Sequence, residues 1–451
     1  MPINFFKGHP SSRLLPAKAI SSAYSSVLST SYDDYEGNPD NRNPLTYGTD
    51  EGNLDVRKTI GEWVGKYYDR RIDPDTICLT GGASYGFANI LNACTHVDYT
   101  KHAFVVSPTY YLINGALLDA GFEGRISAVK ETPQSEYDID LVALEKQLIK
   151  HSLSANTGTI IEDPSRGKWK YYSFVMYMVP TFSNPGGLTY SVKTRKKLLE
   201  IARAYDMLVV CDDVYDLLDY RENPEVIPKV VHLDIDSRNP ENQYGNCISN
   251  NTFSKILAPG IRFGWQECPS AKLAWQVANT GANKSGGTPG QLASTVVAKL
   301  IESGEQNEII AQFIDIYRNR VLRTKQSIKK YLPEGTKVWG GDGGYFLWVE
   351  VAEVQDHSKV VDSLEKKGVI LAAGLNFEVV GDALGWGKHY VRLSVSYLEE
   401  QDIEEGIKQW GKEIEAQLQK ELDEAEVGRS ARLSISDSSM IVLTTEFKEK
   451  T

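Results

Sequence analysis

Residues 251–265 read NTFSKILAPGIRFGW, with Lys255 near the centre of the stretch. Hydroxyl side chains precede this lysine at Thr252 and Ser254, and Arg262 follows it by seven positions. A lysine amine forms a Schiff base with an aldehyde, and hydroxyl groups with a guanidinium fork hold a phosphate. The spacing therefore fits a site for a phosphate-bearing aldehyde. A surface lysine beside a Pro-Gly turn would explain the same four residues taken alone.

Short apolar runs lie on the N-terminal side of this stretch and alternate with helical patterns. The runs cover residues 103–106, 174–179 and 208–211, and a weaker one covers 263–265. Near-continuous apolar runs suit strands that are buried on both faces of a mainly parallel sheet. Residues 198–205 place their apolar side chains on one helical face just before the third run. The pattern predicts an α/β fold.

The pattern of apolar and polar residues changes after about residue 300. A helix is expected over 309–331, and the run 390–395 alternates apolar and polar side chains, which predicts a half-exposed antiparallel sheet in a second domain. The polar and basic segment 152–172 is interpreted as a solvated hairpin or loop rather than a binding site. Residues from Gly428 are serine-rich, and we expect either disorder or a strand that docks through residues 440–443.

Composition and charge limit the possible functions. The 451 residues suggest two to four domains, and ordinary apolar and charged usage indicates a soluble globular protein. Acidic residues number 60 against 49 Lys and Arg, a net charge of -11, which argues against nucleic-acid and anionic-membrane partners. Any anionic ligand must therefore be bound by a local site.

Cysteine and histidine usage argues against a metal site. The five cysteines form no CxxC pair, and the seven histidines form no HExxH motif. Lys7 and Pro10 interrupt the apolar core that a signal peptide requires, and no run of 18 apolar residues follows. We therefore expect a cytoplasmic protein in a reducing compartment.

The stretch around Lys255 resembles the cofactor-lysine motif of fold-type I, pyridoxal-phosphate-dependent aminotransferases of class I/II. The branch containing 2-aminoadipate, kynurenine and aromatic aminotransferases is the most similar, and the resemblance runs from about residue 45 to residue 410. It implies an aspartate aminotransferase-like fold, with a mainly parallel seven-stranded sheet flanked by helices and a smaller α+β domain built from both termini. The implied divisions are an arm with part of the small domain at 1–42, a large cofactor-binding domain at 43–300, a small domain at 301–425 and a tail at 426–451.

The segment LTGGASYG, residues 79–86, resembles the phosphate loop of this family. Its glycines let backbone N–H groups approach a phosphate at a helix N-terminus. The resemblance assigns the phosphate of pyridoxal 5'-phosphate to Gly82, Ala83 and Ser84. Ala83 stands where many relatives carry a hydroxyl, so backbone donors must suffice there. Thr252, Ser254 and Arg262 complete the implied phosphate ligands.

Two further motifs resemble those that hold the cofactor ring. Tyr110, in the segment SPTY, matches an aromatic residue that stacks on the ring, although Tyr111 is an alternative. Asn184, in PTFSNPGG, matches an asparagine that donates to the phenolate oxygen of the cofactor and lies beside the substrate. Without the resemblance, these residues would be read as a core tyrosine and an ordinary turn.

The segment VVCDDVY ends the third apolar run and supplies the acidic partner of the cofactor. The resemblance implies that Asp212 pairs with the pyridine nitrogen and that Tyr215 binds the phenolate oxygen. A protonated ring accepts the electrons released when the substrate Cα–H bond breaks. Lys255 then moves the proton as general acid and base. Asp213 is expected to cap the next helix.

Three arginine and tyrosine positions concern the substrate and the assembly. Arg392 resembles the arginine that grips the substrate α-carboxylate in this family. Tyr47 matches a tyrosine that reaches the phosphate of the neighbouring subunit, which implies a homodimer with shared active sites. Arg13 could engage a side-chain carboxylate of an acidic donor, but an exposed solubilising arginine is the favoured interpretation.

The resemblance implies transfer of an amino group from an amino acid, with 2-aminoadipate or an aromatic donor favoured, to a 2-oxo acid such as 2-oxoglutarate. A pyridoxal-phosphate lyase or a cyclopropane-carboxylate-synthase-like enzyme is the main alternative, because both begin with Cα deprotonation. A non-catalytic cofactor-binding scaffold and a transcriptional regulator are further alternatives. Such regulators carry an N-terminal DNA-binding module, whereas family-like sequence begins here within the first fifty residues.

Overall fold

The computed structural model describes residues 2–30, 35–152, 159–352, 354 and 356–446. Its centre is a seven-stranded sheet in the order β2-β10-β9-β8-β7-β3-β4. The strands are β2 (Ile77–Thr80), β3 (His102–Ser107), β4 (Ile126–Lys130), β7 (Phe174–Met178), β8 (Met207–Asp212), β9 (Cys247–Thr252) and β10 (Gly264–Glu267). β10 runs antiparallel to both neighbours, and the other pairs are parallel. The predicted mainly parallel sheet is confirmed.

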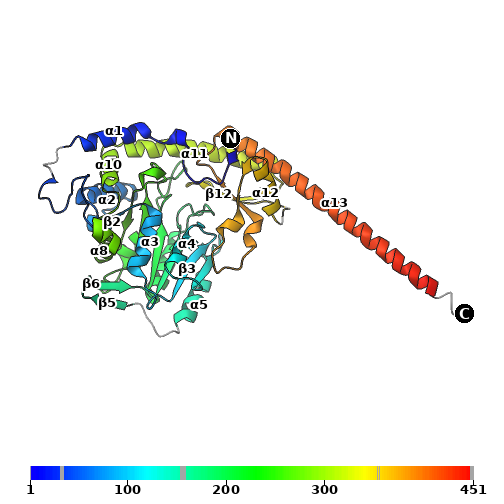
Figure 1. Cartoon of the computed structure of the whole chain (residues 1–451), viewed down its shortest axis with the longest axis horizontal. Coiled ribbons are helices and arrows are strands. Elements are labelled where there is room, and N and C mark those ends of the chain that lie inside the picture. The colour runs from blue at the N-terminus through cyan, green and yellow to red at the C-terminus, as the bar shows by residue number, and fades with distance from the viewer. Residues whose placement is uncertain (1, 31–34, 153–158, 353, 355, 447–451) are drawn as a thin grey trace.

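Helices cover both faces of this sheet (Figure 1). One face packs with α2 (Leu54–Tyr68), α3 (Ala83–Cys94), α8 (Ala271–Ala278) and α10 (Gln291–Glu302), and the other with α5 (Leu141–Ser152), α6 (Val192–Ala204) and α7 (Val230–Ser237). Along β3, Val105 belongs to the first of these cores, whereas Phe104 and Val106 belong to the second. Burial on both faces explains the near-continuous apolar runs of the sequence.

A second sheet, of four strands, is formed by the chain that follows the long helix α11 (Glu305–Tyr331). Its strands are β11 (Lys337–Gly340), β12 (Phe346–Glu350), β14 (Ala372–Ala373) and β15 (Tyr390–Ser394), all antiparallel. The predicted half-exposed sheet is wrong in one respect, because β12 and β15 are buried on both faces. Val391 packs in a core with α12 (Ser358–Lys366) and α13 (Glu400–Glu446), and Trp348 packs against Phe377 on the opposite face.

The beginning of the chain joins this second sheet region. β1 (Ile3–Asn4) pairs in parallel with β13 (Val369–Ile370), and the chain then continues through η1 (Ser12–Leu14) to α1 (Ala17–Leu28), which packs against α10. The remaining short elements are α4 (Ile113–Asp119), α9 (Gly281–Gly286), η3 (Pro74–Thr76), η4 (Pro259–Ile261), η5 (Gly374–Phe377) and η6 (Trp386–His389). Segments from both ends of the chain therefore lie side by side.

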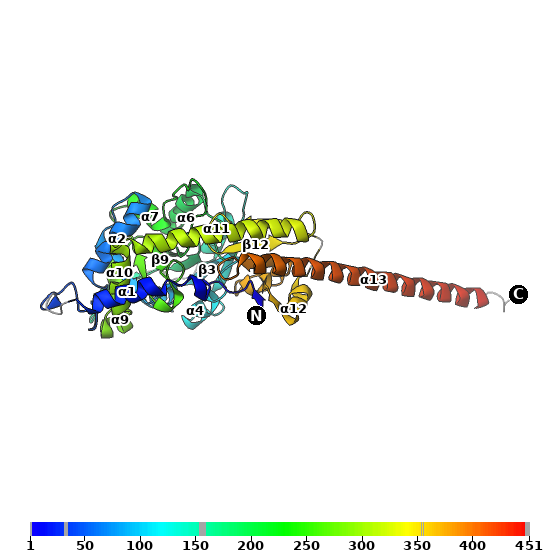
Figure 2. The same cartoon turned by 90° about the horizontal axis from the view of Figure 1, so that it is seen from above.

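Two surface predictions have different outcomes. The segment 152–172 contains a hairpin of β5 (Thr159–Asp163) and β6 (Gly167–Tyr171), as expected, while residues 153–158 lie outside the described part of the chain. Trp169 is fully buried, and its indole N–H donates to the Ala93 carbonyl at 2.6 Å. The tail prediction is wrong over 428–446, because the backbone there continues the helix α13, which leaves the body in both views (Figures 1 and 2).

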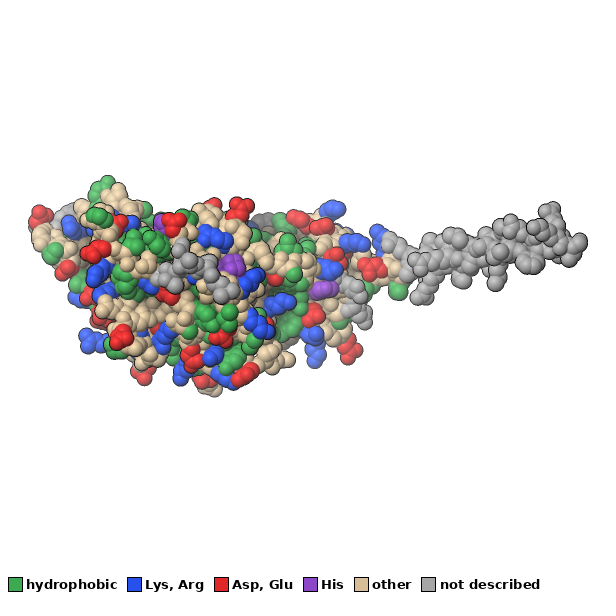
Figure 3. All heavy atoms as spheres, turned by 90° about the horizontal axis from the view of Figure 1, so that it is seen from below, with side chains coloured by type: hydrophobic (Ala, Val, Ile, Leu, Met, Phe, Trp, Pro, Cys, Tyr) green, Lys and Arg blue, Asp and Glu red, His purple; other side chains and the backbone are tan. Residues whose placement is uncertain are grey.

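The molecular surface carries both signs of charge. On the face drawn in Figure 3, basic and acidic side chains are interspersed rather than gathered into one acidic field. No helix in the described ranges is long and apolar enough to cross a membrane. Within the same ranges, no group of three or more His, Cys, Asp or Glu side chains could hold a metal ion.

Candidate active site

Most of the predicted site residues line one cavity of about 190 Å³. The parallel strands β7 and β8 end there, and the loops that follow them meet the N-terminus of α3 and the turn after β9. The predicted residues in its wall are Ala83, Ser84, Tyr110, Asn184, Asp212, Tyr215, Thr252, Ser254, Lys255 and Arg262. Gly82 and Arg392 contact members of this set, whereas Tyr47 lies elsewhere.

One end of the cavity gathers groups suited to a phosphate. Gly82 caps α3 with φ of 96°, and a Cβ at this position would lie 2.9 Å from Nη2 of Arg262. Arg262 donates from Nη1 to Oγ of Ser254 at 3.3 Å, and the Thr252 hydroxyl donates to the same oxygen at 2.9 Å. A helix N-terminus, two hydroxyls and a guanidinium together can hold a dianionic phosphate.

The buried carboxylate Asp212 occupies another part of the wall. Its Oδ2 accepts a hydrogen bond from the Tyr177 hydroxyl at 2.7 Å, and its Oδ1 accepts one from Nδ2 of Asn250 at 3.4 Å. Burial raises the pKa of Asp212 to about 6, against the lowering effect of the bond from Tyr177. Sequence reasoning missed both partners. The available signal for Asn250 was a polar residue in a buried strand, since such groups require hydrogen-bond partners.

Asp213 does not have the role expected from the sequence. No helix follows β8 before α7 in the described chain, so the prediction of an acidic helix cap is wrong. Instead, Oδ2 of Asp213 accepts a hydrogen bond from the Ser249 hydroxyl at 2.6 Å. Asp213 therefore ties the loop after β8 to the neighbouring strand β9.

A buried network of charged side chains contacts β9 and β10. Lys229, which is 1% exposed, donates to Oδ1 of Asn251 at 2.9 Å and to Oε1 of Glu267 at 2.6 Å. Nε2 of His232 lies 3.0 Å from Oε2 of the same glutamate. Asn251 directly precedes Thr252, so this network fixes the strand that delivers the phosphate-facing hydroxyl. No spacing in the sequence identifies these partners.

Lys255 is half-buried, and its side chain lines the cavity. The Nζ atom donates to the Gly8 carbonyl at 2.9 Å and lies 5.9 Å from the centre of the Tyr215 ring. Burial lowers the pKa of Lys255 to about 8, although the Asp212 carboxylate opposes this shift. A lysine with a lowered pKa holds more of the neutral amine near neutral pH, and this is the form that attacks a carbonyl.

Arg392 lies on β15 and reaches the cavity wall from the second sheet. Its Nη1 donates to Oδ1 of Asn184 at 3.0 Å, and its Nη2 donates to the Phe6 carbonyl at 2.6 Å. Its buried Nε has no partner among the described residues. Burial lowers the pKa of Arg392 to about 10. Because Oδ1 of Asn184 accepts from Arg392, the amide N–H groups of Asn184 remain to serve another acceptor.

The two neighbouring tyrosines occupy different surroundings. Tyr110 lines the cavity, and burial raises its pKa to about 12. The ring of Tyr111 instead packs 5.9 Å from Phe377 and 6.1 Å from Phe6. The structure therefore brings Tyr110, and not Tyr111, into the predicted set.

Two predicted positions lie away from the cavity of the same chain. Tyr47 is 80% exposed, and its ring approaches Gly286 rather than Arg262 or Ser254. Arg13 lies in η1 with its side chain exposed, as the solubilising interpretation expected. A contribution of Tyr47 to this cavity therefore requires a second chain.

Comparisons with known proteins agree with this geometry. A sequence model of the family described as aminotransferase class I and II matches residues 30–409. The uncharacterized protein YER152C of Saccharomyces cerevisiae is 43% identical over 427 residues, which cover 91% of this chain and 96% of that protein. Aromatic-amino-acid aminotransferase 1 of Thermococcus litoralis is 28% identical over 377 residues, which cover 83% of this chain and 81% of that enzyme.

A solved structure extends the likeness to three dimensions. The kynurenine aminotransferase of Pyrococcus horikoshii, crystallised in complex with PMP, superposes with a TM-score of 0.72 at 28% identity, covering 92% of this chain and 91% of that one. The matching family model, the fold of the solved relative and the grouping of Lys255 with Asp212 and Arg262 in one cavity all indicate the same family. The chain therefore belongs to the class I and II aminotransferases and is an enzyme of that family.

Proposed function

We propose that the Lys255 cavity binds pyridoxal 5'-phosphate and transfers an amino group from an amino acid to a 2-oxo acid. One observation carries the proposal. Lys255, Asp212 and the group of Arg262 with Thr252 and Ser254 all line one cavity of about 190 Å³. The close approach of Arg262 to Gly82, the Asn184 amide and the unpartnered Nε of Arg392 all fit a phosphorylated cofactor with a carboxylate substrate.

Each residue then has a task set by its chemistry. When bound, pyridoxal phosphate supplies an electron sink for the substrate carbanion. The Asp212 carboxylate keeps a ring nitrogen protonated, because a nearby negative charge favours the cationic form. The Tyr215 hydroxyl and the Asn184 amide donate to an oxyanion on the ring. Lys255, with its pKa lowered to about 8 by burial, accepts the proton from the substrate Cα and returns it.

The substrate is held by its α-carboxylate. The guanidinium of Arg392 is planar, charged and already oriented by Asn184 and the Phe6 carbonyl, so little ordering is needed when a carboxylate arrives. The amino donor we propose is 2-aminoadipate or an aromatic amino acid, with 2-oxoglutarate as acceptor. The aromatic choice is supported by the names of the Thermococcus and Pyrococcus enzymes.

A donor panel tests this function. We expect 2-aminoadipate, kynurenine or an aromatic amino acid to change the visible absorption of the bound cofactor in the purified holoenzyme, and 2-oxoglutarate to restore it. Both half-reactions are needed, because transamination conserves the amino group. Release of ammonia, or a spectrum that no donor changes, would contradict the proposal.

We also propose that the enzyme is a homodimer with shared sites. The support is Tyr47, which is 80% exposed and remote from the cavity of its own chain. Tyr47 of the partner subunit would then reach the phosphate held near Arg262. A symmetric dimer would give two such sites.

Hybrid dimers test this arrangement. A Lys255→Ala chain mixed with a Tyr47→Ala chain is expected to recover activity above the mean of the two parent variants. In the hybrid, one site carries both changes, while the other combines an intact Lys255 with Tyr47 of the partner subunit. Activity no higher than the mean would show that Tyr47 acts within its own chain or not at all.

We also propose a location for the protein and a division into domains. We place the protein in the cytoplasm because all five cysteines are free thiols in the structure. The division into 1–42, 43–300 and 301–425 is supported by the two separate sheets and by the pairing of β1 with β13. The described part of 426–451 is the end of α13.

A further inference from the structure

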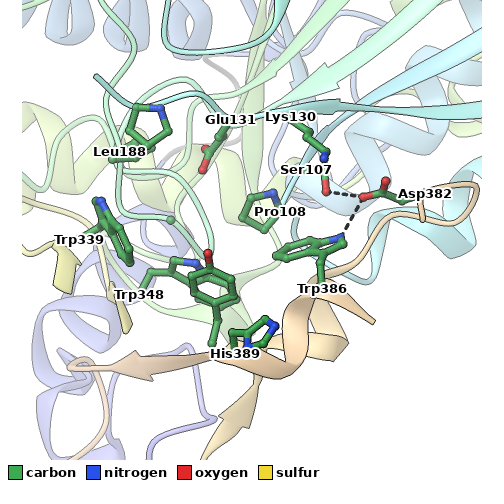
Figure 4. A pocket seen from close by; sticks show the side chains of 13 residues that line it. Ser107, Pro108, Lys130, Glu131, Leu188, Trp339, Trp348, Asp382, Trp386 and His389 are labelled. Carbon is green, nitrogen blue, oxygen red and sulfur yellow. Dashed lines mark hydrogen bonds between the residues drawn. The ribbon is translucent and has the colours of Figure 1, made fainter. Parts of the chain in front are cut away.

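A second cavity, of about 310 Å³, lies where the two sheets meet (Figure 4). It shares no lining residue with the Lys255 cavity. The seven-stranded sheet contributes Ser107 at the end of β3 and Glu131 after β4, and the second sheet contributes β11, β12, β15 and the neighbouring η6. Cavities of this size at a junction between two parts of a protein are typical places for small ligands.

Four aromatic rings form the wall on the side of the second sheet. The ring of Tyr390 stacks on Trp348 with centroids 5.2 Å apart and an interplanar angle of 9°. The rings of Trp339 and Trp386 lie 6.3 and 6.0 Å from Tyr390, at angles of 52° and 67°. A core cluster would fill the space between such rings, but here the cavity remains, and Trp339, Trp386 and Tyr390 are only half-buried.

Two carboxyl groups complete the wall. Oδ2 of Asp382 accepts hydrogen bonds from the Ser107 hydroxyl at 2.9 Å and from the indole N–H of Trp386 at 3.0 Å, so the carboxylate and the ring hold each other in place (Figure 4). Oε1 of Glu131 accepts hydrogen bonds from Ser183 and Tyr190. Burial raises the pKa of Glu131 to about 7.

The second oxygen of Glu131, Oε2, lies beside Gly186 in the cavity wall. Among the described residues, no donor is recorded for Oε2. This atom lies so close to Gly186, another lining residue, that a Cβ there would stand 2.6 Å from it. A larger residue at position 186 would therefore cover the oxygen. The cavity thus combines aromatic rings with one carboxyl oxygen that has no hydrogen-bond donor among the described residues.

Ring faces and carboxylates attract the same kind of ligand. The face of an indole or phenol ring carries a negative potential and binds a cation within about 6 Å. The basic residues of the wall are Lys130, whose side chain is exposed, and His389. Solvent screens the Lys130 charge, so the inner part of the cavity favours a positive ligand.

We propose that this cavity is a second binding site, which takes a small organic cation such as a quaternary or protonated amine. The rings of Trp339, Trp386 and Tyr390 surround the cation, and Glu131 and Asp382 act as its counter-ions. The bound cation also lies against the elements that orient the substrate arginine. Trp348 is the cross-strand partner of Arg392, and Gly186 stands two residues after Asn184.

Choline and its uncharged isostere 3,3-dimethylbutan-1-ol provide a matched pair of probes for calorimetry on the holoenzyme. They have nearly the same shape, so a difference in affinity reports the charge. We expect one choline per chain, bound about tenfold more tightly than the alcohol, as one to two kcal/mol of cation–ring attraction implies. Choline binding should persist in saturating 2-oxoglutarate. Equal affinities, or displacement of choline by 2-oxoglutarate, would overturn the proposal.

Variants locate the probe. Glu131→Gln keeps the shape of the side chain and removes its charge, and Trp386→Leu removes a ring. Each is expected to weaken choline binding at least about fivefold, while leaving the weak binding of the alcohol nearly unchanged in Glu131→Gln. Trp275→Leu is the matched control, because this tryptophan on α8 is 40% exposed and lies outside the cavity. Unchanged choline affinity in Glu131→Gln would place the cation elsewhere.

Discussion

Replacing Lys255 by alanine is expected to reduce transamination by at least about a thousandfold, within the range of roughly 10²–10⁴ that a positioned acid–base group contributes, together with loss of the nucleophilic amine. No other lysine lines the cavity in the described structure, so no neighbouring amine can take over either role. The visible absorption band of the lysine-bound cofactor should disappear in the same variant. Absorption spectra and single-turnover rates check the two effects separately.

A matched control comes from an exposed lysine. Lys337 on β11 pairs with Glu350 at the surface, outside the cavity, and its replacement by alanine should leave the spectrum and the rate unchanged. An unaltered absorption band in Lys255→Ala would show that the cofactor is attached elsewhere. A retained band with lost activity would separate attachment from proton transfer.

Replacing Arg392 by lysine is expected to raise KM for both the amino donor and the 2-oxo acid by roughly ten- to hundredfold. The lysine keeps a positive charge but loses the planar fork, and each charge-assisted hydrogen bond lost costs about 1.5–3 kcal/mol. The fork also orients the Asn184 amide at 3.0 Å, so kcat should fall as well. Steady-state kinetics with both substrates measure the change.

Arg320 offers the control for a buried arginine. It is 1% exposed on α11 and donates to the carbonyls of Val395 and Ser396 at 3.2 and 3.1 Å. Arg320→Lys should lower the thermal stability without a selective rise in KM. If both variants raised KM equally, the effect of Arg392 would be one of folding rather than of carboxylate binding.

Sequence motifs predicted those parts of the site whose residues lie close together in the chain. The phosphate end depends on a glycine before a helix and on hydroxyls one and three positions from Lys255, and the structure brings these groups together. The partners of Asp212 were not predictable in this way. Tyr177 and Asn250 reach Asp212 from neighbouring strands, so their contact depends on the strand order and register, which no local pattern encodes.

Two predictions about the C-terminal region were wrong. The alternation in 390–395 indicated one exposed face, but Phe6 and Phe377 from outside the sheet pack against that face. Serine-rich composition after Gly428 indicated a weak helix former, yet the helix begun at Glu400 continues through it. At 390–395, the packing of the segment therefore outweighed its own sequence preference.

The hydrogen bonds of the site to the N-terminal segment bear on how the protein is made. Arg392 bonds to the Phe6 carbonyl across 386 positions of sequence, and Lys255 bonds to that of Gly8 across 247. Such distant contacts form late, because loop closure must precede them. During synthesis, the seven strands of the large sheet emerge from the ribosome before the second sheet, but Arg392 is added only with β15. We therefore expect a chain that ends before β15 to lack the arginine proposed to bind the substrate carboxylate.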